Sequence, residues 1–219
     1  MQNNRLYLIL SILGLLIIAG FIFIARSPTQ KEKTINEPTE TQSKPTKIME
    51  NTAPEMTIDK NKKYSAVLKT TEGDITIDLN ADKTLITVNN FVTLARKNFY
   101  NSTVFHRVIK GFMIQGGDPK GDGSGGPGYR FDDEPFDGSY TRGTVAMANG
   151  GPNTNGSQFF IMQKDRDLPK DYVIFGKVVS GIEIVDKIAE APVKQNPNMD
   201  EISIPLNPVK VVSVQVNEK

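Results

Sequence analysis

The 219 residues suffice for one ordinary domain with additional segments, because single domains usually contain about 100–200 residues. The 26 lysines and arginines nearly balance the 25 aspartates and glutamates, so the chain has no broad basic field, and no nucleic-acid partner is expected. Without cysteine and with a single histidine, His106, the sequence excludes disulfides, thiol nucleophiles and almost every metal site built from these residues, and no cofactor is expected.

An apolar run begins close to the N-terminus. The segment from Leu6 to Ala25 is about 20 uncharged and almost wholly apolar residues, which is long enough to cross the hydrocarbon core of a membrane as a helix. Residues 1–26 are therefore predicted to form a membrane anchor. A cleavable signal peptide would have a shorter apolar core and small residues near its end, where this chain has phenylalanines. That alternative and a buried core helix stay open.

The orientation of this anchor is not decided by its flanking charges, since basic residues stand on both sides of it. A very short N-terminal tail before a long domain is typical of a signal anchor, and long domains cross the membrane largely regardless of charge. We therefore expect a single-pass membrane protein whose folded domain lies outside the cytoplasm.

Residues 27–61 consist of threonine, proline, lysine, glutamate, glutamine and asparagine with scarcely an aliphatic residue. Such a composition cannot bury enough surface to offset the entropy of the chain, so a disordered linker is predicted. Alternation of apolar and polar residues starts at Tyr64, and residues 62–219 are assigned to one domain.

The domain opens with two alternating runs joined at Gly73, which predict a β-hairpin over residues 64–79. Apolar residues from Val88 to Ala95 recur at helical spacing and predict a helix that ends before Asn98. A second helix is predicted over residues 182–189. Short strands are predicted at residues 103–109, 112–115, 143–148, 158–163, 172–178 and 209–216. Many strands with two helices indicate a mainly β protein, a closed antiparallel barrel capped by the helices.

Four segments of the domain carry a recognisable pattern: VFHRVI at 104–109, GFMIQGGD at 111–118, MANGGPNTNGSQFF at 147–160 and VIFGKV at 173–178. Together they resemble the cyclophilin family of peptidyl-prolyl cis-trans isomerases. The resemblance spans about residues 64–219. It implies an eight-stranded barrel whose outer face carries a groove for proline-containing segments of client proteins.

The resemblance also implies that Arg107 is the catalytic residue. Prolyl isomerisation breaks no bond, so a fixed and always protonated donor that favours the twisted amide suffices, and no general base is needed. Because side chains alternate along a strand, His106 points away from the face that holds Arg107, and a structural role is assigned to it.

The remaining matches describe how the substrate would be held. An apolar slot the size of a proline ring, donors and acceptors for the peptide, and room for the residue before the proline are expected. The substrate-binding residues implied are Phe112, Met113, Gln115, Ala148, Asn149, Gln158, Phe160, Leu168 and Tyr172.

Two positions depart from the family pattern. Asp167 stands where many members carry an indole beside the proline pocket, and Tyr172 replaces a frequent histidine. Affinity for cyclosporin and substrate preference are therefore in doubt. A tethered module that binds proline-containing segments without catalysis is the main alternative, and a structural envelope protein is a third. The protein is expected to be a monomer.

Overall fold

The computed structural model describes residues 53–219. Strands β1 (Tyr64–Thr70) and β2 (Gly73–Leu79) form the first hairpin and pair in register along their whole length. Buried and less buried side chains alternate along β1, as expected for a strand with one face on the core. This confirms the hairpin predicted from the alternating pattern.

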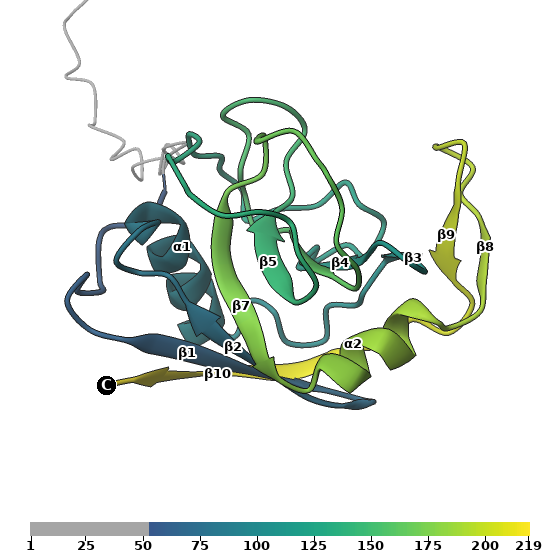
Figure 1. The fold of residues 1–219 in the computed structure, drawn as a ribbon, viewed down its shortest axis with the longest axis horizontal. Coiled ribbons are helices and arrows are strands. Elements are labelled where there is room, and N and C mark those ends of the chain that lie inside the picture. Colours follow the sequence, from purple (N-terminus) through teal and green to yellow (C-terminus); the bar gives the residue numbers. More distant parts are fainter. Residues whose placement is uncertain (1–52) are drawn as a thin grey trace, which may run out of the picture. The chain divides into compact units, whose positions relative to one another are not determined.

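Eight strands form one antiparallel sheet in the order β10-β1-β2-β7-β5-β6-β4-β3 (Figure 1). The predicted number of strands in the main sheet is therefore confirmed. The other members are β3 (Arg107–Ile109), β4 (Met113–Gly116), β5 (Thr144–Met147), β6 (Phe159–Met162), β7 (Ile174–Ser180) and β10 (Val211–Glu218).

The predicted closure of the barrel is wrong, because the edge strands β3 and β10 do not form a ladder and the sheet is a half-barrel. The segments just before these strands meet only through the isolated bridge of Val104 with Lys210 and a few backbone hydrogen bonds. After this bridge the chain leaves the β10 edge, and β3 lies beside β9 instead. Strand β3 is then only three residues long.

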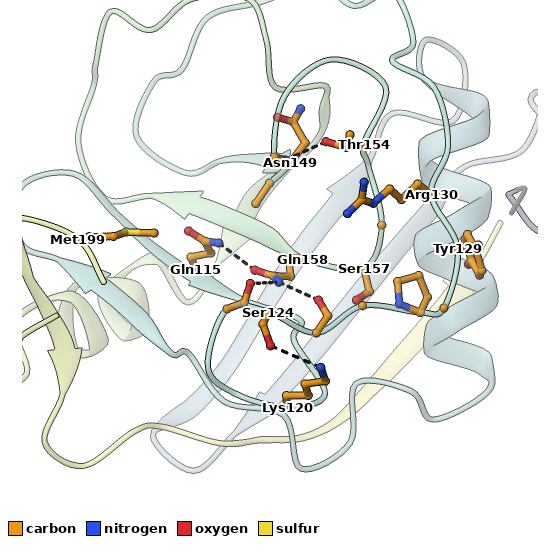
Figure 2. Close-up of a pocket in the computed structure, with 18 residues that line it drawn as sticks. Gln115, Lys120, Ser124, Tyr129, Arg130, Asn149, Thr154, Ser157, Gln158 and Met199 are labelled. Atoms are coloured by element: carbon orange, nitrogen blue, oxygen red, sulfur yellow. Dashed lines mark hydrogen bonds between the residues drawn. The ribbon is translucent and has the colours of Figure 1, made fainter. Parts of the chain in front are cut away.

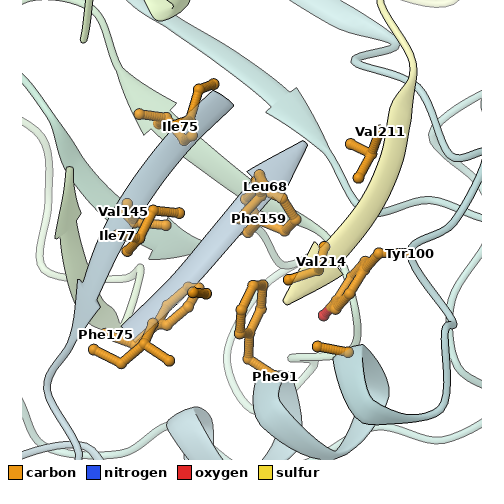
Figure 3. Packing of buried hydrophobic residues seen from close by; sticks show 14 of the residues in the cluster. Leu68, Ile75, Ile77, Phe91, Tyr100, Val145, Phe159, Phe175, Val211 and Val214 are labelled. Carbon is orange, nitrogen blue, oxygen red and sulfur yellow. The ribbon is translucent and has the colours of Figure 1, made fainter. Parts of the chain in front are cut away.

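Both predicted helices are present. In helix α1 (Leu85–Arg96) every residue from Thr87 to Ala95 is buried, and α2 (Ile182–Ala189) has the bounds that the sequence indicated. Phe91 of α1 lies at the centre of the core, with ring centroids 5.0 Å from Tyr100, 5.7 Å from Phe159 and 5.3 Å from Phe175 (Figure 3). The apolar face of α1 thus closes the inner side of the curved sheet and leaves the outer side for a binding groove.

The folded domain starts further upstream than the predicted boundary at residue 62. The Asn89 amide of α1 donates to the carbonyls of Pro54 and Glu55 and accepts from the Thr57 N–H at 2.8 Å, while Ile58 is buried. Three backbone groups therefore bind the last residues of the predicted linker to α1, and Ile58 joins the hydrophobic core. The predicted anchor, residues 1–26, lies outside the described residues. Within residues 53–219 no helix has the length and apolarity that crossing a membrane requires.

A small second sheet was not predicted. Strands β8 (Val193–Gln195) and β9 (Ile202–Pro205) pair as an antiparallel hairpin. The hairpin stands beside β3, at the end of the domain away from α1 (Figure 1). It brings residues near the C-terminus of the chain next to Arg107.

Candidate active site

Arg107 occupies the first position of the short edge strand β3, directly opposite Gln115 of β4. Two edges of its guanidinium group are used. The Nε–H donates to Oε1 of Glu201 at 2.6 Å and Nη2 donates to Oε2 at 2.9 Å. The other nitrogen, Nη1, donates to Oε1 of Gln115 at 3.2 Å and lies 4.0 Å from the sulfur of Met113. The guanidinium plane is therefore fixed from both sides.

Arg107 stands at the wall of a cavity of about 290 Å³ on the outer side of the sheet. Its lining is mostly apolar and aromatic, with the guanidinium and an amide as polar groups, which is typical of a small-molecule or peptide side-chain site. The lining residues are Arg107, Phe112, Met113, Gln115, Ala148, Asn149, Phe160, Leu168, Tyr172 and Met199.

Aromatic packing holds the apolar wall in place. The Phe160 ring meets Tyr172 edge to face with centroids 5.5 Å apart. Behind them the Tyr140 hydroxyl donates to the Tyr172 carbonyl at 2.9 Å and accepts from the Tyr172 N–H at 3.1 Å. On the opposite side, the Arg166 guanidinium lies 5.5 Å from the centre of the Phe112 ring. The cavity thus has a rigid apolar floor.

A larger cavity of about 750 Å³ continues the groove past Ala148, Asn149, Gln115 and Met199, which line both cavities. Its far wall is a glycine-rich loop, residues 123–130, and Figure 2 shows Gln158 between this loop and Gln115. An extended peptide can therefore occupy both cavities at once, with consecutive residues on either side of the shared residues.

A chain of hydrogen bonds joins the glycine-rich loop to Arg107. Gln158 donates both protons of its amide to the carbonyls of Gly123 and Gly125, each at 2.9 Å. Gln158 Oε1 accepts from Gln115 at 3.0 Å, and Gln115 accepts from Arg107. Gln158 is therefore a support for Gln115, because the donors of its side chain are already engaged.

The loop itself is built on the buried carboxylate of Asp118. Three backbone N–H groups donate to it, those of Lys120 at 2.8 Å, Asp122 at 3.2 Å and Gly123 at 2.6 Å. Gly125 packs so closely on this carboxylate that a Cβ at residue 125 would overlap an oxygen of Asp118. Asp118 thus sets the path of the loop whose carbonyls hold Gln158.

The charged groups of the site differ in their protonation. The Arg107 guanidinium holds the pKa of the Glu201 carboxyl below its usual range through two hydrogen bonds, so the pair is ionic at neutral pH. Burial lowers the pKa of His106, which keeps the ring neutral, and His106 lines neither cavity. Residues 53–219 contain no cluster of three or more acidic, cysteine or histidine side chains that could hold a metal ion.

Comparison with known proteins agrees with this geometry. The sequence profile described as cyclophilin type peptidyl-prolyl cis-trans isomerase/CLD matches residues 65–216. This chain belongs to the cyclophilin family. Its members are peptidyl-prolyl cis-trans isomerases, and the chain is an isomerase of this type.

The matches to two named relatives of this cyclophilin extend over most of the length of each relative. Peptidyl-prolyl cis-trans isomerase-like 3 of Dictyostelium discoideum is 45% identical over 159 residues, 70% of this chain and 95% of the relative. Peptidyl-prolyl cis-trans isomerase CYP18-1 of Arabidopsis thaliana is 49% identical over 128 residues, 56% of this chain and 80% of the relative.

A cyclophilin type isomerase of Cryptosporidium parvum, solved in the presence of the dipeptide Ala-Pro, superposes with a TM-score of 0.62 at 36% identity. The match covers 70% of this chain and 98% of that one. The fold of this cyclophilin is therefore that of an isomerase studied with a proline-containing peptide.

The structure gathers most of the predicted site of this cyclophilin in one place. Every predicted site residue lines the smaller cavity except Gln158, which lines the larger one. Asp167 is exposed and lines neither cavity, so its short side chain does not form the pocket wall that an indole would form. The side-chain amide of Asn149 donates to the Asp171 carbonyl at 2.7 Å.

Two residues of the site were missed. Met199 lines both cavities, and Glu201 holds Arg107; both lie in or next to the unpredicted hairpin β8–β9. No motif marks either residue, and the only available signal was the acidic pair Asp200-Glu201 in a segment otherwise without a charged cluster.

Proposed function

We propose that this cyclophilin accelerates rotation about X-Pro bonds by stabilising the twisted amide with Arg107, while the smaller cavity holds the proline ring. The observation that carries the proposal is the guanidinium group at the wall of an apolar cavity. Its Nη1 lies 3.2 Å from Gln115 Oε1 and 4.0 Å from Met113 Sδ, and both of these residues line the cavity. A donor is therefore held where a bound proline would sit.

The chemistry requires no base and no nucleophile, because no covalent bond breaks. The barrier of about 18–20 kcal/mol is the lost resonance of the amide. When the C–N bond is twisted, the prolyl nitrogen regains its lone pair and accepts a hydrogen bond. A donor fixed near that nitrogen stabilises the twisted state more than either planar isomer, which is what lowers a barrier.

The acceleration required is within reach of this arrangement. Uncatalysed X-Pro bonds rotate in tens to hundreds of seconds. Bringing this to milliseconds takes four or five decades, about 5–7 kcal/mol at about 1.4 kcal/mol per decade. One charged donor in a partly dry cavity supplies several kcal/mol, and fixing one end of the peptide supplies the rest.

In this proposal the two cavities divide the work of binding. Phe112, Met113, Phe160 and Leu168 desolvate the proline ring, and Ala148 leaves room for the residue before it. The backbone of Asn149, which lines both cavities, would bind the peptide between them. Partners are then proline-containing segments of client proteins, bound by a monomer.

The test is a protease-free isomerisation assay on the full-length protein with a proline peptide. Arg107→Ala should lower kcat/KM by about two decades or more while the circular dichroism stays native, and Arg107→Lys should restore little because it lacks the planar fork. Arg96→Ala is the matched control, since Arg96 forms an exposed ion pair with Glu218 at 2.9 Å and lines neither cavity. Unchanged activity in Arg107→Ala would refute the proposed mechanism.

The second candidate is a module that holds proline-containing segments but isomerises them poorly. The exposure of Asp167 favours it, because no aromatic side chain at residue 167 covers the bound ring. The same assay separates the two. Peptide binding by the wild-type protein with no acceleration of exchange would support the binding module, whereas exchange on the millisecond scale would support the isomerase.

We also propose that the domain is attached to a membrane and faces away from the cytoplasm. The apolar run from Leu6 to Ala25 is long enough to span the hydrocarbon core as a helix, and long domains cross the membrane largely regardless of flanking charge. Full-length protein should then resist extraction by carbonate and by high salt.

Protease added to intact cells, stripped of any outer layer, tests the orientation. Cleavage between Ser27 and Asn61 should release an active domain. Protection of this segment until the cells are lysed would mean that the domain faces the cytoplasm and would reverse the proposal.

A further inference from the structure

We propose that Glu201 is a positioning residue for isomerisation: its carboxylate holds the Arg107 guanidinium in the orientation that presents Nη1 to the substrate. The inference rests on the proposed role of Arg107. It assigns a function in the reaction to the hairpin β8–β9, which none of the sequence motifs includes.

The two edges of the guanidinium face different surroundings. The Nε and Nη2 edge is bound by both carboxylate oxygens of Glu201, at 2.6 Å and 2.9 Å. The Nη1 nitrogen faces Gln115 and Met113, which line the smaller cavity. Glu201 lines neither cavity. It therefore cannot act on a bound peptide directly and acts through Arg107.

The geometry is the one that fixes an arginine best. Two parallel N–H···O bonds from one planar guanidinium to one carboxylate restrict both its position and the rotation of its plane. Glu201 and Arg107 are each only 23% exposed at their side chains, so water screens the pair less than a pair on the open surface. A bond from Ser203 to the carboxylate also favours the charged form of Glu201 and lowers its pKa.

Arg107 needs such a support because its own strand gives it little. Strand β3 is a three-residue edge strand, paired only with β4, and Nη1 is restrained only by Gln115 and by the long contact with Met113 Sδ. A freely rotating arginine side chain would place Nη1 near the prolyl nitrogen for only part of the time. The conformational entropy lost when the side chain is fixed would then add to the activation free energy of isomerisation. Because Glu201 holds Arg107 in the folded protein, this entropy is already lost before the substrate binds.

Neutralising Glu201 should therefore lower kcat more than it raises KM. Glu201→Gln keeps the shape of the side chain but sets an amide N–H against a guanidinium N–H, so one of the two bonds is lost. We expect kcat to fall about tenfold, as for the release of one immobilised side chain. KM for a neutral peptide should change less than about threefold, because Phe112, Met113 and Phe160, which hold the ring, are untouched.

The experiment measures kcat and KM by exchange NMR on full-length wild type, Glu201→Gln, Glu201→Ala and Arg107→Ala. Glu190→Gln is the matched control, since it removes a carboxylate from an exposed ion pair with Lys110, 3.4 Å long, on a residue that lines neither cavity. The Nε–H signal of Arg107, identified by its loss in Arg107→Ala, reports the orientation. We expect it to be sharp and slowly exchanging in wild type and in Glu190→Gln, and broadened in both Glu201 variants.

The outcomes separate the two proposals. If Arg107→Ala is inactive while Glu201→Gln and Glu201→Ala keep wild-type or higher kcat, Glu201 has no positioning role and the assignment of Arg107 stands. If Arg107→Ala is fully active, both proposals fall. If the Glu201 variants lose kcat only in proportion to a loss of folded protein, with the Arg107 signal unchanged in the folded fraction, the role of Glu201 is structural and the inference is overturned.

Discussion

Asp118→Asn should weaken both the fold and the site, because the buried carboxylate of Asp118 organises the loop that supports Gln158. The carboxylate accepts three backbone N–H groups, one on Oδ1 and two on Oδ2. An asparagine has one acceptor oxygen. The asparagine side chain keeps two of the three hydrogen bonds if this oxygen faces the N–H groups of Asp122 and Gly123. Its NH₂ group then faces the Lys120 N–H, so the third hydrogen bond is lost.

The magnitude follows from that count. A hydrogen bond to a charged group contributes about 1.5–3 kcal/mol, and the two that remain become weaker neutral bonds. We expect Asp118→Asn to lower the free energy of unfolding by about 2–3 kcal/mol. Asp118→Ala, which removes all three acceptor contacts, should cost about 4 kcal/mol or more. Because a domain of this size is stable by about 5–15 kcal/mol, the Asn variant should remain folded at 25 °C.

Urea unfolding of the full-length protein followed by circular dichroism measures the loss, and hydrogen exchange at the Gly123 amide reports the loop. Asp122→Asn is the control in the same loop, since Asp122 is exposed and its carboxylate accepts only local hydrogen bonds, among them the Ser124 backbone N–H at 2.8 Å. Its effect should stay within about 0.5 kcal/mol. Wild-type urea midpoints and unchanged Gly123 exchange in Asp118→Asn would refute the reasoning.

Two further predictions concern single side chains. Burial lowers the pKa of His106 in the folded protein, so the unfolded chain binds the extra proton as pH falls below about 6.5 and the free energy of unfolding decreases from pH 7 toward pH 5. His106→Phe should flatten this dependence in urea titrations at both pH values, and an equal slope in the variant would show that another group is responsible. Asp167→Trp should tighten cyclosporin binding at least about tenfold while changing turnover only modestly, because an indole covers apolar surface and donates one N–H whereas the exposed carboxylate does neither. Calorimetric titration of both proteins decides this, and equal affinities would mean that residue 167 does not reach the groove.

Except for Met199, the residues that line the smaller cavity were available from the sequence because the resemblance to the cyclophilin family implied them, and strand pairing explains why three of them meet. Arg107 and Gln115 stand opposite each other on β3 and β4, and Phe160 follows on the next strand, so their shared face is a consequence of strand pairing. The length of each strand was harder to predict from the sequence. The barrel is not closed because the edges meet only through the isolated bridge of Val104 with Lys210 and a few backbone hydrogen bonds, and the extent of that pairing has no marker in the residue types.

The hairpin β8–β9 was not predicted from the sequence for a related reason. Its strands have three and four residues, and prolines interrupt the segment at Pro192, Pro197 and Pro205, so no period-two pattern can develop. Glu201 reaches Arg107 across 94 positions of the chain, a contact that only the folded sheet creates. The start of the domain could not be predicted from the sequence either. Ile58 is an isolated apolar residue in a polar tract, and Asn89 binds the residues before it through their backbone groups, which carry no sequence signal.

The hydrogen bonds of residues 54–57 with Asn89 determine which part of the domain first bears a mechanical force that is applied to the chain N-terminal to it. A pull transmitted along the chain meets α1 first, and α1 and the hairpin β8–β9 lie at opposite ends of the domain (Figure 1). Tension would therefore strip the short segment around Ile58 from the helix before it reached the strands that carry Arg107. For work with immobilised protein, a surface linkage upstream of residue 53 is the attachment to choose, because strand β3 with Arg107 and the hairpin β8–β9 lie at the end of the domain away from α1.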